Sequence, residues 1–143
     1  MKTYRILLSM VLALMLVSGL ACGGGDNDDD DLAPDSMGGI TYQVTITSGT
    51  GSVFATSGTA TLAFNADGTY TITGDGGTNT DDSNGTYTQT KLSSDSVEVV
   101  LNSATIPEFQ AATYIFTYTS DNAGAFTATL PSGDTQSGTF QVL

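Results

Sequence analysis

Apolar and polar residues alternate along most of the chain from Ile40 onward. Residues 40–46 place isoleucine, tyrosine, valine and isoleucine at every second position, with threonine and glutamine between them. Strict alternation is typical of strands that bury one face and expose the other. The same pattern predicts about eight strands, at residues 40–47, 53–64 (with a bulge near Ser57-Gly58), 69–74, 84–90, 95–101, 112–119, 124–130 and 137–142.

Turn-forming residues separate these segments, as in Asp67-Gly68 and Asn84-Gly85. Glycine and asparagine adopt the positive φ angles that tight hairpins require, so strands adjacent in sequence are expected to pair. The predicted fold is all-β: an antiparallel up-and-down meander of about eight strands that closes as a small barrel, because closure removes unpaired edges. An immunoglobulin-like sandwich is the alternative. Helical periodicity is absent from this part of the sequence, and a single turn near Pro107 is the one exception to consider.

A weak internal repeat runs through the same region. The segment Ser83-Asn84-Gly85-Thr86-Tyr87 recurs as Gln136-Ser137-Gly138-Thr139-Phe140. Two halves of a few strands each would have to close on each other, since one half alone leaves its aromatic face in water. The alternative is that any threonine- and glycine-rich meander resembles itself.

The N-terminal residues have the order of an export signal. Lys2 and Arg5 precede an uncharged apolar stretch at residues 6–17, and small residues then lead to Cys22. This order is typical of a secretory signal peptide, and the apolar stretch is short for a spanning helix. The sequence therefore predicts a signal peptide at 1–21, an acidic flexible tether at 22–36 and a β domain at 37–143.

Leu20-Ala21-Cys22 after an apolar run resembles a bacterial lipoprotein lipobox, although Gly19 stands where leucine is usual. The resemblance implies that Cys22 carries lipid and that the protein's membrane partner is reached through this anchor. An ordinary secreted protein with one thiol is the alternative. Glycine after the cysteine, followed by an acidic run, resembles the tethers of outer-membrane lipoproteins, which implies a cell-envelope location that is periplasmic or surface-exposed.

The phrase Leu62-Ala63-Phe64-Asn65-Ala66-Asp67-Gly68-Thr69-Tyr70-Thr71, followed by Asn84-Gly85-Thr86-Tyr87, resembles lipocalin-like bacterial lipoproteins over residues 37–143. The resemblance implies a barrel that accepts a small apolar or glycan ligand. The chain has no tryptophan, so it lacks the Gly-x-Trp motif of the first lipocalin strand.

Composition excludes several kinds of chemistry. The chain has a formal net charge of −12, and Lys91 is its only basic residue after Arg5, which argues against nucleic-acid binding. It has no histidine, and its one cysteine is assigned to lipid, so histidine-based catalysis, thiol nucleophiles and cysteine-ligated zinc are not expected. From these absences the sequence predicts no catalytic residues, no resident cofactor and no enzyme activity.

One acidic loop is a candidate calcium site. Asp75, Asn79, Asp81 and Asp82 place oxygen atoms within eight residues on a glycine-rich backbone. Calcium takes six to eight such ligands, although the spacing differs from an EF-hand and the same residues are common in exposed hairpins.

Two functions remain. Eight strands leave an interior that side chains can fill or that can hold one small ligand. Because aromatic residues occur on nearly every predicted strand, the sequence favours a filled barrel that acts as a structural or interaction module of a membrane-anchored exported lipoprotein. The alternative is a lipocalin-like module that binds a small apolar or glycan ligand.

Overall fold

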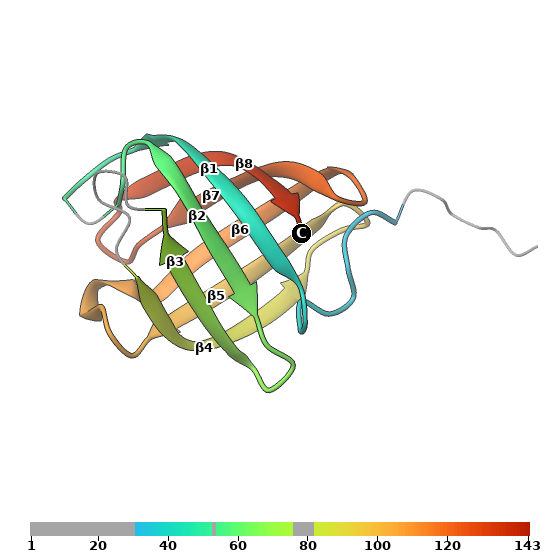
Figure 1. Ribbon diagram of the computed structural model, residues 1–143, viewed down its shortest axis with the longest axis horizontal. Helices are drawn as coiled ribbons and strands as arrows, with labels where there is room; N and C mark the ends of the chain where they lie inside the picture. Colours follow the sequence, from blue (N-terminus) through green and yellow to red (C-terminus); the bar gives the residue numbers. More distant parts are fainter. Residues whose placement is uncertain (1–30, 53, 76–81) are drawn as a thin grey trace, which may run out of the picture.

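The computed structural model describes residues 31–52, 54–75 and 82–143, and within them the chain forms one closed antiparallel barrel (Figure 1). Each strand pairs with its neighbours in sequence, and the first pairs with the last. The predicted meander and its closure are therefore confirmed, and the sandwich alternative is wrong. The strands are β1 (Thr41–Gly49), β2 (Gly58–Phe64), β3 (Thr69–Gly74), β4 (Ser83–Lys91), β5 (Ser96–Ser103), β6 (Gln110–Ser120), β7 (Ala123–Thr129) and β8 (Thr135–Val142).

The closing pair sets the register of the whole ring. Tyr42 lies opposite Val142 and Val44 lies opposite Phe140, so inward-facing residues of β1 meet inward-facing residues of β8. A shift of one residue would turn every apolar side chain of β1 toward water. A register irregularity after Ile46 then lets β1 bend away toward its loop with β2.

Asn84-Gly85, predicted as a turn, lies inside β4, and one predicted strand boundary is wrong by more than two residues. The strand predicted at 53–64 begins at Gly58, and Phe54 and Ala55 lie in the preceding loop with 4% of their surface exposed. These two apolar residues cover one end of the barrel, where the centroid of the Phe54 ring lies 5.4 Å from that of Phe109. Phe109 ends a single 3₁₀ turn at Pro107–Phe109, which confirms the helical turn considered there.

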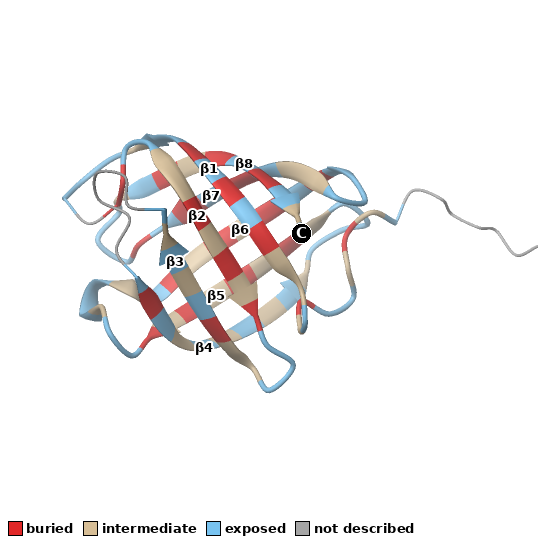
Figure 2. Cartoon of the chain, viewed as in Figure 1, coloured by how far each residue is buried: buried red, intermediate tan, exposed pale blue. Residues whose placement is uncertain are grey.

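Aromatic rings fill the barrel, and Figure 2 shows buried positions alternating with exposed or intermediate ones along most of the strands. Phe116 is fully buried, and its ring centroid lies 5.2 Å from that of Tyr42 and 5.4 Å from that of Phe140. Such offset and edge-to-face pairs add to the burial of apolar surface. The largest fully buried side chains are Tyr42, Tyr70, Phe64, Phe116, Phe126, Phe140, Met37, Leu62, Leu101, Val97 and Val99.

Two inward-facing glycines make room for this packing. A Cβ atom on Gly138 would lie 2.0 Å from the Thr45 carbonyl oxygen, and one on Gly85 would lie 2.0 Å from that of Asn102. Glycine therefore allows the backbone of the next strand to approach closely at both places. These glycines correspond in the internal repeat, on β4 and β8, although a duplication of the chain stays a prediction.

Replacement of Phe116 by alanine should lower the free energy of unfolding by about 3–5 kcal/mol, because it leaves a cavity among rings that cannot collapse into it. Thr117→Ala, on the exposed face of the same strand, should cost far less. Urea unfolding followed by circular dichroism measures both. Equal losses for the two variants would contradict the packing described.

Candidate functional site

An N-terminal strap, residues 31–40, crosses one end of the barrel, which we call the strap end. The Ala33 amide donates a hydrogen bond to the Ser94 carbonyl (2.8 Å). The Gln89 side chain makes two more hydrogen bonds to the strap: its oxygen accepts one from the Met37 amide (2.5 Å), and its nitrogen donates one to the Asp35 carbonyl (2.7 Å). Ala33 and Met37 are buried in the core. The strap therefore closes this end of the barrel with its own backbone and side chains.

Lys91, at the end of β4, holds the acidic part of the strap. Its Nζ atom lies 2.7 Å from a carboxylate oxygen of Asp31 and 2.8 Å from one of Asp35. The hydrogen bond and charge of Lys91 lower the pKa of Asp35, and the two carboxylates raise the pKa of Lys91. The sequence assigns residues 31–36 to a flexible tether, but here they pack on the barrel. The rest of the predicted tether lies outside the described residues, so the three-part division of the chain stays a prediction.

A pair of buried tyrosines lies directly beneath the strap. The hydroxyl groups of Tyr42 and Tyr118 are 2.5 Å apart, and the Tyr42 hydroxyl also lies 3.4 Å from the Met37 sulfur. Burial raises the pKa of both phenols, and for Tyr42 the hydrogen bond to Tyr118 raises the pKa further. Both groups therefore stay neutral, and each satisfies the polar atom of the other inside an apolar core.

A second polar cluster lies toward the opposite end, which we call the far end. Ser83 Oγ lies 3.1 Å from the Tyr70 hydroxyl and 2.9 Å from Ser103 Oγ. Ser103 Oγ in turn accepts a hydrogen bond from the Ile106 amide (2.9 Å). The Tyr114 hydroxyl is also buried, its pKa is raised by desolvation, and it has no hydrogen-bond partner among the described residues. An interior polar group of this kind needs an explanation, such as an ordered water or a small ligand.

The outside of the barrel carries two shallow hollows over strands β1, β7 and β8. The larger, about 400 Å³, lies toward the strap end, where the end of β6 also lines it through Thr119, and the smaller, about 190 Å³, lies nearer the far end. Their outward-facing linings are uncharged: Gln43, Thr45, Thr119, Ala123, Thr139 and Gln141 for the larger, and Ser48, Thr127, Thr129, Thr135 and Ser137 for the smaller. Nothing in the local sequence distinguishes these positions from other polar strand residues, because β1, which is distant in sequence from β7 and β8, forms the hollows together with them.

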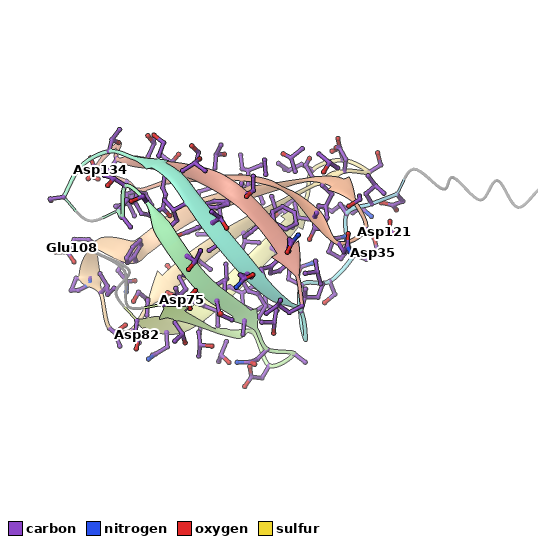
Figure 3. All side chains as sticks on the ribbon, turned by 45° about the horizontal axis from the view of Figure 1, so that its top comes forward. Asp35, Asp75, Asp82, Glu108, Asp121 and Asp134 are labelled. Carbon is purple, nitrogen blue, oxygen red and sulfur yellow. The ribbon has the colours of Figure 1, made fainter. Side chains whose placement is uncertain are left out.

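The residues of the predicted calcium loop are only partly placed. Asp75 accepts a hydrogen bond from the Thr59 hydroxyl, and Asp82 Oδ1 accepts one from the Gly74 amide (3.0 Å) (labelled in Figure 3). Asn79 and Asp81 lie outside the described residues. No group of three or more histidine, cysteine, aspartate or glutamate side chains that could hold a metal occurs among the residues described. The calcium site stays a prediction.

Cys22, the predicted lipidation site, also lies outside the described part of the chain, so lipidation stays a prediction. Across residues 31–52, 54–75 and 82–143, no helix is long and apolar enough to cross a membrane.

Comparisons with known proteins add little. No family model and no curated protein matches the chain. One similar solved structure is a protein from Burkholderia vietnamiensis described as a "putative beta-lactamase", with 19% identity and a TM-score of 0.47, over 78% of this chain and 99% of that one.

The prediction that this chain is not an enzyme requires a correction. The sequence predicts that the chain is not an enzyme, whereas the name of this similar structure points toward one, so we withdraw the prediction. The absence of histidine removes only some mechanisms, which is why it was too weak a basis for excluding all of them. At this TM-score the likeness carries no argument for a particular activity of this chain either.

Removing one hydroxyl of the buried tyrosine pair should destabilise the barrel more than removing both. Tyr42→Phe leaves the Tyr118 hydroxyl buried without its partner, which should cost about 1–3 kcal/mol of unfolding free energy. The double variant Tyr42→Phe/Tyr118→Phe should recover most of that loss, because no phenol then remains unpaired. A double-mutant cycle by urea unfolding tests this, and additive losses would contradict it.

Lys91→Gln should loosen the strap. Hydrogen exchange at the Ala33 amide should become severalfold faster, while Thr90→Ala, which changes an outward-facing neighbour, should leave it unchanged. In the wild type this protection should fall with decreasing pH, because a lowered Asp35 pKa means that the ion pair stabilises the folded state until that carboxylate is protonated. Persistence of the same pH dependence in Lys91→Gln would exclude the ion pair as its cause.

Proposed function

We propose that the protein is an exported, lipid-anchored structural or interaction module that acts through the outer surface of its barrel. The observation that carries the proposal is the packing of Tyr42, Phe116 and Phe140 at the centre of the barrel. Side chains occupy the space in which a barrel of eight strands could hold one ligand. Recognition by a filled barrel has to use its loops or its outer wall.

The membrane anchor in this proposal is lipid on Cys22. It is supported by the order of charge, apolar residues and small residues before that cysteine. The acidic run that follows supports a location at the outer membrane, facing either the periplasm or the outside. The eight-stranded meander is compatible with a lipocalin-like lipoprotein, and the resemblance of residues 62–71 and 84–87 to that class supports it.

A small-ligand function is the second candidate, favoured by one observation. The Tyr114 hydroxyl is buried near the far end without a partner among the described residues, close to the Tyr70–Ser83–Ser103 cluster. A small polar group bound there would satisfy it. The aromatic packing around Phe116 restricts such a ligand to the far end.

Mass spectrometry of the protein purified from its own membrane tests the proposal. The intact mass should equal residues 22–143 plus acyl chains, and Cys22→Ala should remain unprocessed and lack the added mass. Under native conditions the wild type should show no further bound mass. An unmodified thiol on Cys22 would overturn the anchor, and a stoichiometric bound molecule would favour the second candidate.

A further inference from the structure

Charge is distributed very unevenly over this barrel. Within the eight described strands, Lys91 and Glu98 are the only charged residues, and Lys91 faces the strap. The other described acids lie in the loops or the strap, and Figure 3 shows Asp75, Asp82, Glu108 and Asp134 at the far end and Asp35 and Asp121 at the strap end. An ordinary domain surface carries about 25–35% charged residues. The wall between the two ends therefore carries a single outward charge, Glu98, in a strongly acidic protein.

Hydroxyl side chains are the most frequent outward-facing groups on this wall. Strand register places Thr59, Thr45 and Thr139 side by side on β2, β1 and β8. Eighteen threonines occupy outward positions of the strands: Thr41, Thr45, Thr47, Thr59, Thr61, Thr69, Thr71, Thr73, Thr86, Thr88, Thr90, Thr113, Thr117, Thr119, Thr127, Thr129, Thr135 and Thr139. Such a surface offers donors and acceptors of hydrogen bonds in every direction but no charge.

Two glutamines distinguish one face of this wall. Gln43 on β1 lies opposite Gln141 on β8, and both are exposed at the larger hollow. Neither side chain hydrogen-bonds another described residue, nor do the flanking Thr45 and Thr139. The other three glutamines are all engaged: Gln89 binds the strap, Gln110 binds the Ser103 carbonyl and Gln136 binds the Ala55 carbonyl. Among the glutamines of the described strands, those without a hydrogen-bond partner thus lie at the hollow.

We propose that the face formed by β1, β7 and β8 binds a neutral polysaccharide. Sugar hydroxyl groups both donate and accept hydrogen bonds, as do the amides of Gln43 and Gln141 and the hydroxyls of Thr45 and Thr139. The small residues Ala123 and Ala125 on β7 leave room for a sugar ring to approach the sheet, and threonine methyl groups provide contacts for its C–H groups. The inference rests on the proposed function, because it names the partner class of an interaction module that acts through its outer surface.

Shape and charge favour a chain of sugars over other partners. The smaller hollow lies farther along β7 and β8 toward the far end, so the two open hollows lie in a row on one face, as separate contact points for a long polymer would. Protein interfaces usually depend on aromatic or arginine anchors, and the outward-facing residues of the described strands include neither. Acidic ends on either side of this row repel nucleic acids and anionic polysaccharides. Each sugar unit contributes little, and repeated contacts along one polymer supply the affinity.

Affinity electrophoresis tests the proposal with the full mature protein, purified from membranes in a nonionic detergent. Native gels contain dextran, mannan or laminarin as neutral polymers, and dextran sulfate as a charged control with the same backbone as dextran. At least one neutral polymer should retard the wild type, and dextran sulfate should not. Gln43→Ala/Gln141→Ala and Thr45→Ala/Thr139→Ala should each weaken retardation about tenfold, the effect of about 1.4 kcal/mol of lost hydrogen bonding.

The matched control is Thr71→Ala/Thr88→Ala, which removes two exposed threonines from β3 and β4, outside both hollows. It should bind as the wild type does, and thermal unfolding should show that all variants remain folded, since exposed substitutions of this kind are nearly neutral. Absence of retardation by all three neutral polymers would overturn the proposal. So would retardation that persists in both hollow variants, or that is equal with dextran sulfate. The acyl mass on Cys22, read from the same samples, separates failure of this inference from failure of the lipid anchor.

Discussion

The pairing of β1 with β8 is the constraint on which the rest of the structure depends. Until those strands meet, β1 and β8 each expose a row of unpaired backbone groups, and the aromatic face of the sheet has nothing to cover it. Closure gives every strand two neighbours and fixes an interior of limited width. With one cysteine in the chain, no disulfide can form within it, so the packing of Tyr42, Phe116 and Phe140 has to supply the stability that cross-links supply in small disulfide-rich domains.

Closure of the ring leaves two open ends, and the chain closes each differently. At the strap end, Met37 enters the core and places its sulfur against the Tyr42–Tyr118 pair, so the backbone that leads into β1 also seals the barrel. At the far end, Phe54 and Phe109 come from two separate loops and meet over Tyr114. Buried polar side chains near both ends are held by specific partners, with the Tyr114 hydroxyl as the exception among described residues.

Most of the fold could be predicted because it is encoded locally. Alternation predicts each strand, and residues such as Asp67-Gly68 predict the turns, so adjacent pairing follows without knowledge of distant contacts. The sequence pattern places Phe54 in a strand, because an apolar residue beside an alternating segment looks the same in sequence whether it faces the interior of a sheet or covers the end of a barrel. Asp31 and Asp35 were assigned to a solvated tether because their partner, Lys91, is far away in sequence. The larger hollow cannot be found from the sequence for the same reason, since Gln43 and Gln141 lie opposite each other only when the barrel closes.

Threonine on the wall has two physical explanations, and they differ in what they account for. β-Branched residues favour strands, so threonine at outward positions stabilises the sheet whatever the protein does. Lysine and glutamate are also tolerated at such positions and raise solubility, however, so strand preference alone does not explain a wall whose one outward charge is Glu98 on β5. It also does not explain Gln43 opposite Gln141, because glutamine has no β-branch and gains no packing at an exposed site. A requirement for neutral hydrogen-bonding groups on the β1, β7 and β8 face accounts for the glutamine pair and for the absence of charge on that face, and it leaves the acidic charge at the ends to keep the protein soluble.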